Sequence, residues 1–178
     1  MIDQAKKKRL RRSMLFLNCQ KPSLIRDPYI YHPDSIILDL EDAVAENQKD
    51  AARFSLYHAL QEVDYRGVER VVRINGLDTP HWQEDVRVSV AGGADVIRIP
   101  KCVCAQDIQR VEEAVRAAEK EFGVPEVPRC LWAPWNPAWA SSTPWKSAGP
   151  ASGSSAWLCP AAILPRICRL TSPSRALS

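Results

Sequence analysis

The chain has 178 residues and a mild net charge of +3, which predicts one domain large enough to bury a substantial core. It contains no apolar run near the ~20 residues of a membrane span and begins with charged residues, so we expect neither a membrane-spanning helix nor a secretory signal. Its six cysteines include no CxxC pair, which argues against a disulfide framework and a metal site and favours a reducing, cytoplasmic compartment.

The first feature along the chain is the basic run KKKRLRR at residues 6–12. Such a run could bind nucleic acid or an anionic surface, but it lacks the interleaved aromatic residues that nucleic-acid recognition normally adds. We therefore expect a solvated N-terminal arm and no nucleic-acid partner. A short apolar strand is predicted at residues 13–17, and Pro22 suits the first turn of a helix.

The stretch SIILDLEDAV, residues 35–44, organises the rest of the chain. Residues 36–38 form a continuous apolar run that is typical of a strand buried on both faces. Asp39, Glu41 and Asp42 follow where this run ends, and β/α proteins place their chemistry at the carboxyl ends of strands. From the spacing alone, a catalytic role and a solvated helix start rich in acids both stay open.

Strand and helix patterns then alternate as far as residue 126. Further strands are predicted at residues 70–74 and 96–99, and helices at residues 47–61, 84–91 and 108–122. The helix at 47–61 is expected to bury Ala51, Phe54, Leu56, Tyr57 and Leu60. Four strand-then-helix units predict an α/β fold with a parallel sheet and outer helices, about half of a barrel of eight units, which needs about 250 residues.

Two cations lie at predicted strand ends. Arg73 precedes Asn75 and Gly76, and a cation inside a sheet is costly unless it has an anionic partner. It could bind a carboxylate through two hydrogen bonds, or it could simply reach solvent. Lys101 follows the strand at 96–99, and we expect a supporting role for it.

Residues 127–178 differ sharply in composition from residues 1–126. They contain none of the 21 acidic residues and five of the six tryptophans. We therefore predict a half-barrel domain at 1–126 and an aberrant, disordered tail at 127–178.

The segments RRSMLFL, DLEDAVAENQKDAAR, YHAL, VVRING and GGADVIRIPK occur in this order, and from about Arg11 to Gly123 the chain resembles the citrate lyase β subunit family. This family of citryl-CoA lyases lies within the acid-aldolase and malyl-CoA lyase superfamily. The resemblance implies a TIM (β/α)8 barrel, usually oligomeric, that cleaves a citryl thioester into oxaloacetate and an acetyl thioester with Mg²⁺. It also implies a CoA-bound or carrier-protein-bound acyl thioester as substrate and citrate lyase α and γ subunits as partners.

The resemblance also implies roles for the candidate residues. Arg73, Asp42 and Glu41 match catalytic positions, and Arg73, Asp39 and Lys101 match substrate-binding positions. A retro-aldol cleavage leaves an enolate, so cations must stabilise the oxygen charge as it develops. The family holds Mg²⁺ with a Glu after the fifth strand and an Asp after the sixth. Neither ligand is present in this chain, which we therefore expect to be inactive as written.

The missing ligands suggest an origin for the tail. Where the family has a Met-Glu-Ser motif, this chain reads Pro-Trp-Asn-Pro at residues 134–137. Codons CCA TGG AAT CCN, read from the third nucleotide, encode Met-Glu-Ser, and the same offset over residues 160–165 yields an Asp-bearing segment. We interpret the tail as a frameshifted reading, whether real or from a sequencing error. A natural Pro/Ser/Trp-rich extension is the rival interpretation.

One further hypothesis for the whole chain involves no catalysis. The chain could be a truncated interaction module that docks onto partner lyase subunits. Closely related lyases share the same motifs, so the sequence does not decide which acyl thioester is used.

Overall fold

Five parallel strands form one sheet in a computed structural model that describes residues 11–102, 105–124 and 130–132. The strands are β1 Met14–Asn18, β2 Ser35–Asp39, β3 Glu69–Arg73, β4 Val96–Arg98 and β5 Cys130–Trp132. Their order in the sheet is their order along the chain, and every neighbouring pair is parallel. This succession is the arrangement of a β/α barrel, whereas a doubly wound sheet reverses its strand order at a switch point.

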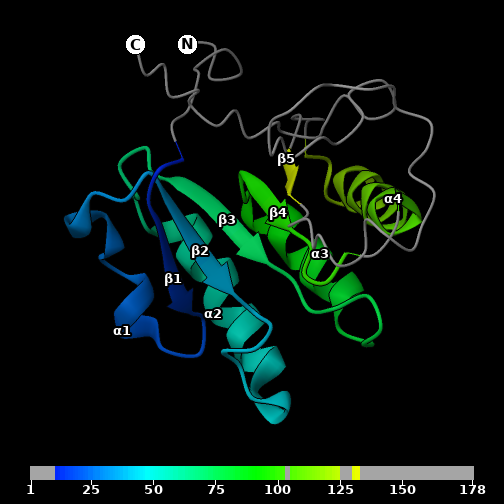
Figure 1. Ribbon diagram of the computed structural model, residues 1–178, viewed down its shortest axis with the longest axis horizontal. Helices are drawn as coiled ribbons and strands as arrows, with labels where there is room; N and C mark the ends of the chain where they lie inside the picture. The colour runs from blue at the N-terminus through cyan, green and yellow to red at the C-terminus, as the bar shows by residue number, and fades with distance from the viewer. Residues whose placement is uncertain (1–10, 103–104, 125–129, 133–178) are drawn as a thin grey trace, which may run out of the picture.

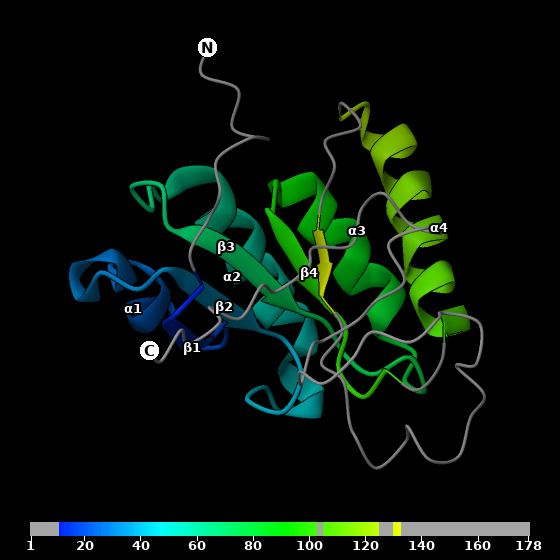
Figure 2. The ribbon, with the colours of Figure 1, turned by 45° about the horizontal axis from the view of Figure 1, so that its top comes forward.

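Helices connect the strands and cover one face of the sheet. The helices are α1 Pro22–Ile25, α2 Lys49–Glu62, α3 Trp82–Gly92 and α4 Ala105–Phe122, and the 3-10 helices are η2 Pro28–Tyr31 and η3 Glu46–Gln48. Helices α2, α3 and α4 lie side by side behind the sheet (Figure 1, Figure 2). The predicted α/β class, with a parallel sheet and four β/α units, is confirmed. Strand β5 extends the sheet beyond residue 126, where the composition predicts a domain boundary.

Strand side chains alternate between the two faces of the sheet. Those that face the helices belong to the main core and include Ile36, Leu38, Val72 and Ile97. Those on the opposite face form a smaller cluster of Ile37, Val71 and Val96. Every residue of β2 is buried, which confirms the prediction of a strand covered on both faces.

The predicted buried face of α2 is wrong in part. Leu56 and Leu60 are buried, but Phe54 is 68% exposed, Tyr57 is 39% exposed, and Ala51 is also exposed. The apolar residues that do face the core are Ala52, Leu56, Ala59 and Leu60. The buried residues follow each other at helical spacing on one face, and Ala51, Phe54 and Tyr57 lie off that face.

Helix α4 follows its predicted pattern except at its last turn. The buried apolar residues are Ile108, Val111, Val115 and Ala118. Phe122, which the periodicity also places in the core, is exposed and lies against Arg87, whose guanidinium carbon is 5.8 Å from the ring centroid. Gly123 adopts φ 61° directly after the helix, a left-handed conformation that glycine accepts without strain, as expected for a helix end.

The solvated arm predicted from the basic run is found only in part at its end, since Arg12 is exposed but Arg11 is largely buried. The Arg11 guanidinium donates two hydrogen bonds to the buried Glu69 carboxylate, at 2.7 and 2.5 Å. The Arg12 guanidinium pairs with Asp34, which also accepts the backbone N–H groups of Arg12 and Ser13. These contacts lower the pKa of Asp34 to about 2, with the Arg12 side chain as the main cause. Both arginines therefore tie the N-terminal segment to the amino ends of the strands.

Other sequence predictions concern residues outside the described part of the chain. The remaining basic residues at 6–10 belong there, and so does the predicted tail at 127–178, apart from β5. Across the described residues, no helix combines the length and the apolarity that crossing a membrane requires.

Candidate active site at the carboxyl ends of the strands

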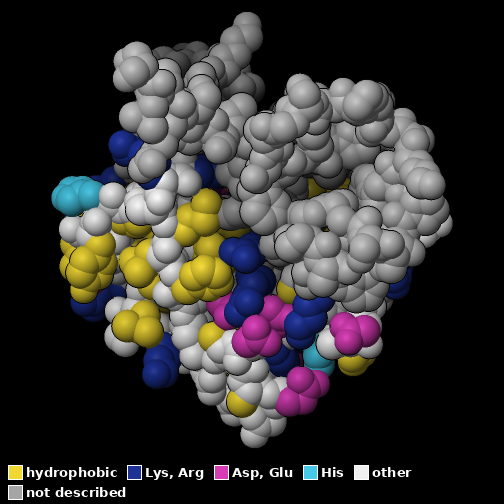
Figure 3. All heavy atoms as spheres, viewed as in Figure 1, with side chains coloured by type: hydrophobic (Ala, Val, Ile, Leu, Met, Phe, Trp, Pro, Cys, Tyr) yellow, Lys and Arg dark blue, Asp and Glu magenta, His cyan; other side chains and the backbone are white. Residues whose placement is uncertain are grey.

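One row of paired residues ends four neighbouring strands. Asn18 of β1 pairs with Asp39 of β2, Asp39 pairs with Arg73 of β3, and Arg73 pairs with Arg98 of β4. Paired residues of parallel strands point to the same face, so these four side chains lie on the face away from the helices. Figure 3 shows this face, where basic and acidic side chains gather beside an apolar patch. The carboxyl end of a parallel sheet is also where β/α proteins form their active sites.

Asp39 holds Arg73 and the following turn at the same time. Its Oδ1 accepts hydrogen bonds from Arg73 Nε at 2.7 Å and from the Glu41 N–H at 2.9 Å. Its Oδ2 accepts bonds from Arg73 Nη2 at 2.6 Å and from the Ala43 N–H at 3.2 Å. These four bonds use the roughly four acceptor positions of a carboxylate. Asp39 therefore fixes the orientation of Arg73.

Arg73 also contacts the other two predicted acids. Its Nη1 lies 3.1 Å from Glu41 Oε2 and donates a hydrogen bond of 3.3 Å to Asp42. The pKa of Arg73 is raised, mainly by the hydrogen bond to Asp39 and then by the charges of all three acids, although burial opposes the shift. Its hydrogen bonds to Asp39 and Asp42 and its ion pair with Glu41 engage Nε, Nη1 and one N–H of Nη2. With respect to the described residues, this leaves one N–H of Nη2 that can donate to a bound molecule.

Lys101 joins the same group of charges through Glu41. Its Nζ lies 3.2 Å from Glu41 Oε1, and this carboxylate raises the pKa of the lysine. Lys101 adopts φ 47°, a left-handed conformation that is uncommon for a residue with a side chain and is frequent at functional sites. The structure thus brings all five predicted residues into one connected set, in which Asp42 is the most exposed acid at 65%.

Two neighbours of this set were not predicted, Arg98 and Phe16. The Phe16 ring is 51% exposed, and the guanidinium carbons of Arg73 and Arg98 lie 5.4 and 5.3 Å from its centroid. Burial lowers the pKa of Arg98, and the charge of Arg73 lowers it further. In the sequence, Arg98 interrupts the apolar run VIRIP just as Arg73 interrupts RVVRI, so the same argument could have found it.

A buried polar network supports the loop that carries Glu41 and Asp42. Lys49 Nζ donates hydrogen bonds to the carbonyl oxygens of Leu40 and Glu41, both at 2.8 Å, and to Asn75 Oδ1 at 2.7 Å. Asn75 in turn donates its backbone and side-chain N–H groups to Asp85, which also pairs with Arg53. A buried lysine at the start of a helix has no distinct sequence signal, so the network was missed.

The described residues contain no cluster of metal ligands. Mg²⁺ prefers hard oxygen ligands, usually one or two carboxylates with waters. No group of three His, Cys, Asp or Glu residues within the described ranges could hold a metal ion. The oxygens of Asp39 already accept four hydrogen bonds, and both Glu41 oxygens lie against cations. The acids at this edge therefore position Arg73 and Lys101.

Comparison with known proteins decides the family. The model of the HpcH/HpaI aldolase/citrate lyase family matches residues 12–149. The chain belongs to this family. It is 50% identical over 117 residues to the citrate lyase subunit beta of Leuconostoc mesenteroides subsp. cremoris, covering 66% of this chain and 39% of that protein. It is 43% identical over 120 residues to the Escherichia coli K12 subunit, covering 67% and 40%.

Relatives with other names are similar over the same stretch. The L-malyl-CoA/beta-methylmalyl-CoA lyase of Rhodobacter capsulatus is 39% identical over 118 residues, covering 65% of this chain and 37% of that protein. The CitE protein of Mycobacterium tuberculosis, solved in complex with magnesium, acetoacetate and coenzyme A, is 28% identical with a TM-score of 0.51, covering 70% of this chain and 40% of that one. The chain spans about two fifths of the length of the curated relatives that it matches.

Proposed function

We propose that the chain is a citrate lyase β-type carbon–carbon lyase polypeptide that acts on a citryl thioester. The observation that carries the proposal is Arg73, which Asp39 orients at the carboxyl ends of the strands with one N–H group to spare. The names of two curated relatives, 50% and 43% identical to the chain, support the substrate class. The substrate would be bound to CoA or to a carrier protein, and citrate lyase α and γ subunits and further copies of the chain would be its partners.

The residues present fit the anionic course of this cleavage. The proton of the substrate hydroxyl is removed, the bond to the carbon beside the thioester breaks, and oxaloacetate and the enolate of the acetyl thioester form. The enolate then takes up a proton to give the acetyl thioester. The remaining N–H group of Arg73 can donate to an oxygen that gains negative charge, and Lys101 adds a second positive charge. Asp42 is the exposed acid that can accept the hydroxyl proton.

We include Mg²⁺ in the proposal because structures of the CitE relative contain it. A metal ion supplies electrostatic stabilisation of substrate oxygens in such sites. The described residues of this chain provide no ligands for it, so their part is to bind and orient the substrate. Together with the absence of Asp and Glu from residues 127–178, this leads us to expect no turnover by the chain as written.

A turnover assay with citryl-CoA, with and without Mg²⁺, tests the proposal. Two proteins are compared: the chain as written, and a frame-restored protein whose codons from about residue 129 onward are read from the third nucleotide. We expect oxaloacetate release only from the frame-restored protein and only with Mg²⁺. No release from either protein would contradict the lyase proposal. It would then favour the interaction module, which co-purification with a citrate lyase α subunit would reveal.

A further inference from the structure

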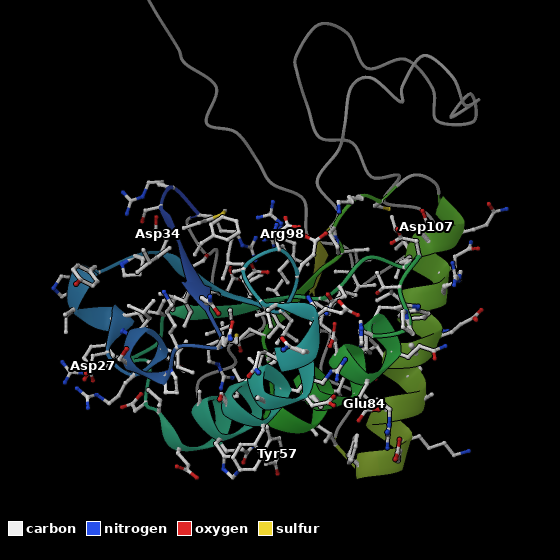
Figure 4. All side chains as sticks on the ribbon, turned by 90° about the horizontal axis from the view of Figure 1, so that it is seen from below. Asp27, Asp34, Tyr57, Glu84, Arg98 and Asp107 are labelled. Carbon is white, nitrogen blue, oxygen red and sulfur yellow. The ribbon has the colours of Figure 1, made fainter. Side chains whose placement is uncertain are left out.

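Arg98 is a second guanidinium group at the proposed substrate site. It is the register partner of Arg73 on the neighbouring strand, and strands of a sheet lie about 4.8 Å apart. Both guanidinium carbons lie within 5.4 Å of the Phe16 ring centroid, one from β3 and one from β4. Figure 4 shows Arg98 on the sheet face opposite the helices, the face that also carries Arg73. One small molecule over this face can therefore reach both groups.

Two acids of the site act on both arginines. Asp39 and Glu41 contact Arg73, and their charges also raise the pKa of Arg98. Burial and the positive charge of Arg73 outweigh this effect and lower the pKa of Arg98. A bound anion would offset the repulsion between the two cations. Phe16 contributes an apolar ring close to both guanidinium groups, which strengthens charge interactions by excluding water.

The number of carboxylates separates the candidate substrates. A citryl thioester carries two free carboxylates and releases oxaloacetate, a dicarboxylate. A malyl thioester carries one and releases glyoxylate, a monocarboxylate. The fork of Arg73 already holds Asp39, whereas a second guanidinium group can donate charged hydrogen bonds to a second carboxylate.

We propose that Arg98 binds the second carboxylate of the substrate and makes the site specific for dicarboxylate over monocarboxylate products. This inference rests on the proposed function, because it assigns Arg98 a place in the same substrate site. Arg73 binds the part that both substrates share, and Arg98 binds the part that only the citryl compound has. Phe16 contacts both guanidinium groups through its ring and is a positioning residue.

Calorimetric titration of the full chain with oxaloacetate and, separately, with glyoxylate tests the proposal. We expect Arg98→Gln to weaken oxaloacetate binding by about 10-fold or more, because it removes charged hydrogen bonds, and to change glyoxylate binding by less than about 2-fold. Arg98→Lys keeps the charge but not the paired N–H groups of the guanidinium, so its affinity for oxaloacetate should fall by an intermediate amount. Arg73→Gln should weaken both ligands. The matched control is Arg87→Gln, because Arg87 is an exposed arginine of α3 that pairs with Glu84 and Glu121. It should change the binding of neither ligand.

Each outcome has a distinct meaning. If Arg98→Gln weakens both ligands equally or neither, the specificity role is overturned while the proposed function stands. If Arg73→Gln changes neither ligand, or if the unaltered chain binds neither, the proposed substrate site itself fails. Circular dichroism of each variant checks folding. If Arg98→Gln does not fold, Arg98→Lys decides the question, and equal affinity of Arg98→Lys and the unaltered chain for oxaloacetate overturns the role.

Discussion

At the amino ends of the strands Arg11 donates two hydrogen bonds to Glu69, and at the carboxyl ends Arg73 donates two to Asp39. The first pair is a buried acid held by one arginine, with Ser35 Oγ as a further donor. The second pair belongs to a larger group in which Arg73, Lys101 and Arg98 lie near three acids. An arginine–carboxylate ion pair thus ties down a chain segment at one end of the sheet, and at the other end it orients Arg73, the cation that we propose binds substrate.

Replacing Arg73 is expected to have the largest effect on turnover. In the frame-restored protein, Arg73→Gln should reduce kcat by about 10²–10³, as the loss of a donor to a developing oxyanion does. It should also destabilise the fold, because the Asp39 carboxylate is buried and would lose its counter-charge. The double variant Asp39→Asn/Arg73→Gln removes both charges. It should regain stability in urea unfolding without regaining turnover, and recovery of both together would show that Arg73 is only structural.

At the amino end we expect the reverse, so that a substitution lowers stability and leaves substrate binding unchanged. Glu69→Gln should lower the free energy of unfolding by about 1.5–3 kcal/mol, because it weakens charged hydrogen bonds to Arg11. Oxaloacetate binding should stay unchanged, since Glu69 begins β3 and Arg73 ends it. Urea unfolding and calorimetric titration measure the two quantities. Ser35→Ala, which removes the neutral donor to the same carboxylate, should cost only about 1 kcal/mol. If Glu69→Gln also weakened oxaloacetate binding, the two ends of the sheet would no longer differ in the function that we assign to them.

Local patterns were sufficient to predict much of this arrangement. The apolar run of β2 ends at Asp39, and Arg73 interrupts a similar run, so alternation of strands and helices was enough to bring them to one edge. The contact of Phe16 with both arginines depends on strand register, which no local pattern reveals. The buried face of α2 was predicted wrongly in part, because the size of an apolar residue does not show whether its side chain faces the core. Phe54 is exposed there while Ala52 is buried.

The smallest effect concerns Asp34, the partly buried partner of the exposed Arg12 at the amino end. Its pKa falls from the ordinary 3.8 to about 2 in the folded protein, mainly through the Arg12 side chain. Between these two values the unfolded chain binds a proton that the folded protein does not, so acidification favours unfolding. The contribution of Asp34 to stability is therefore complete above about pH 4 and is lost as the pH falls toward 2. Asp34→Asn should be less stable than the unaltered chain near neutral pH, and urea unfolding should show this difference shrinking between pH 4 and pH 2. Glu113→Gln, which removes one exposed charge from α4, is the control and should not reproduce this trend. A stability difference for Asp34→Asn that is constant across this range would show that Arg12 and Asp34 do not interact in the folded protein.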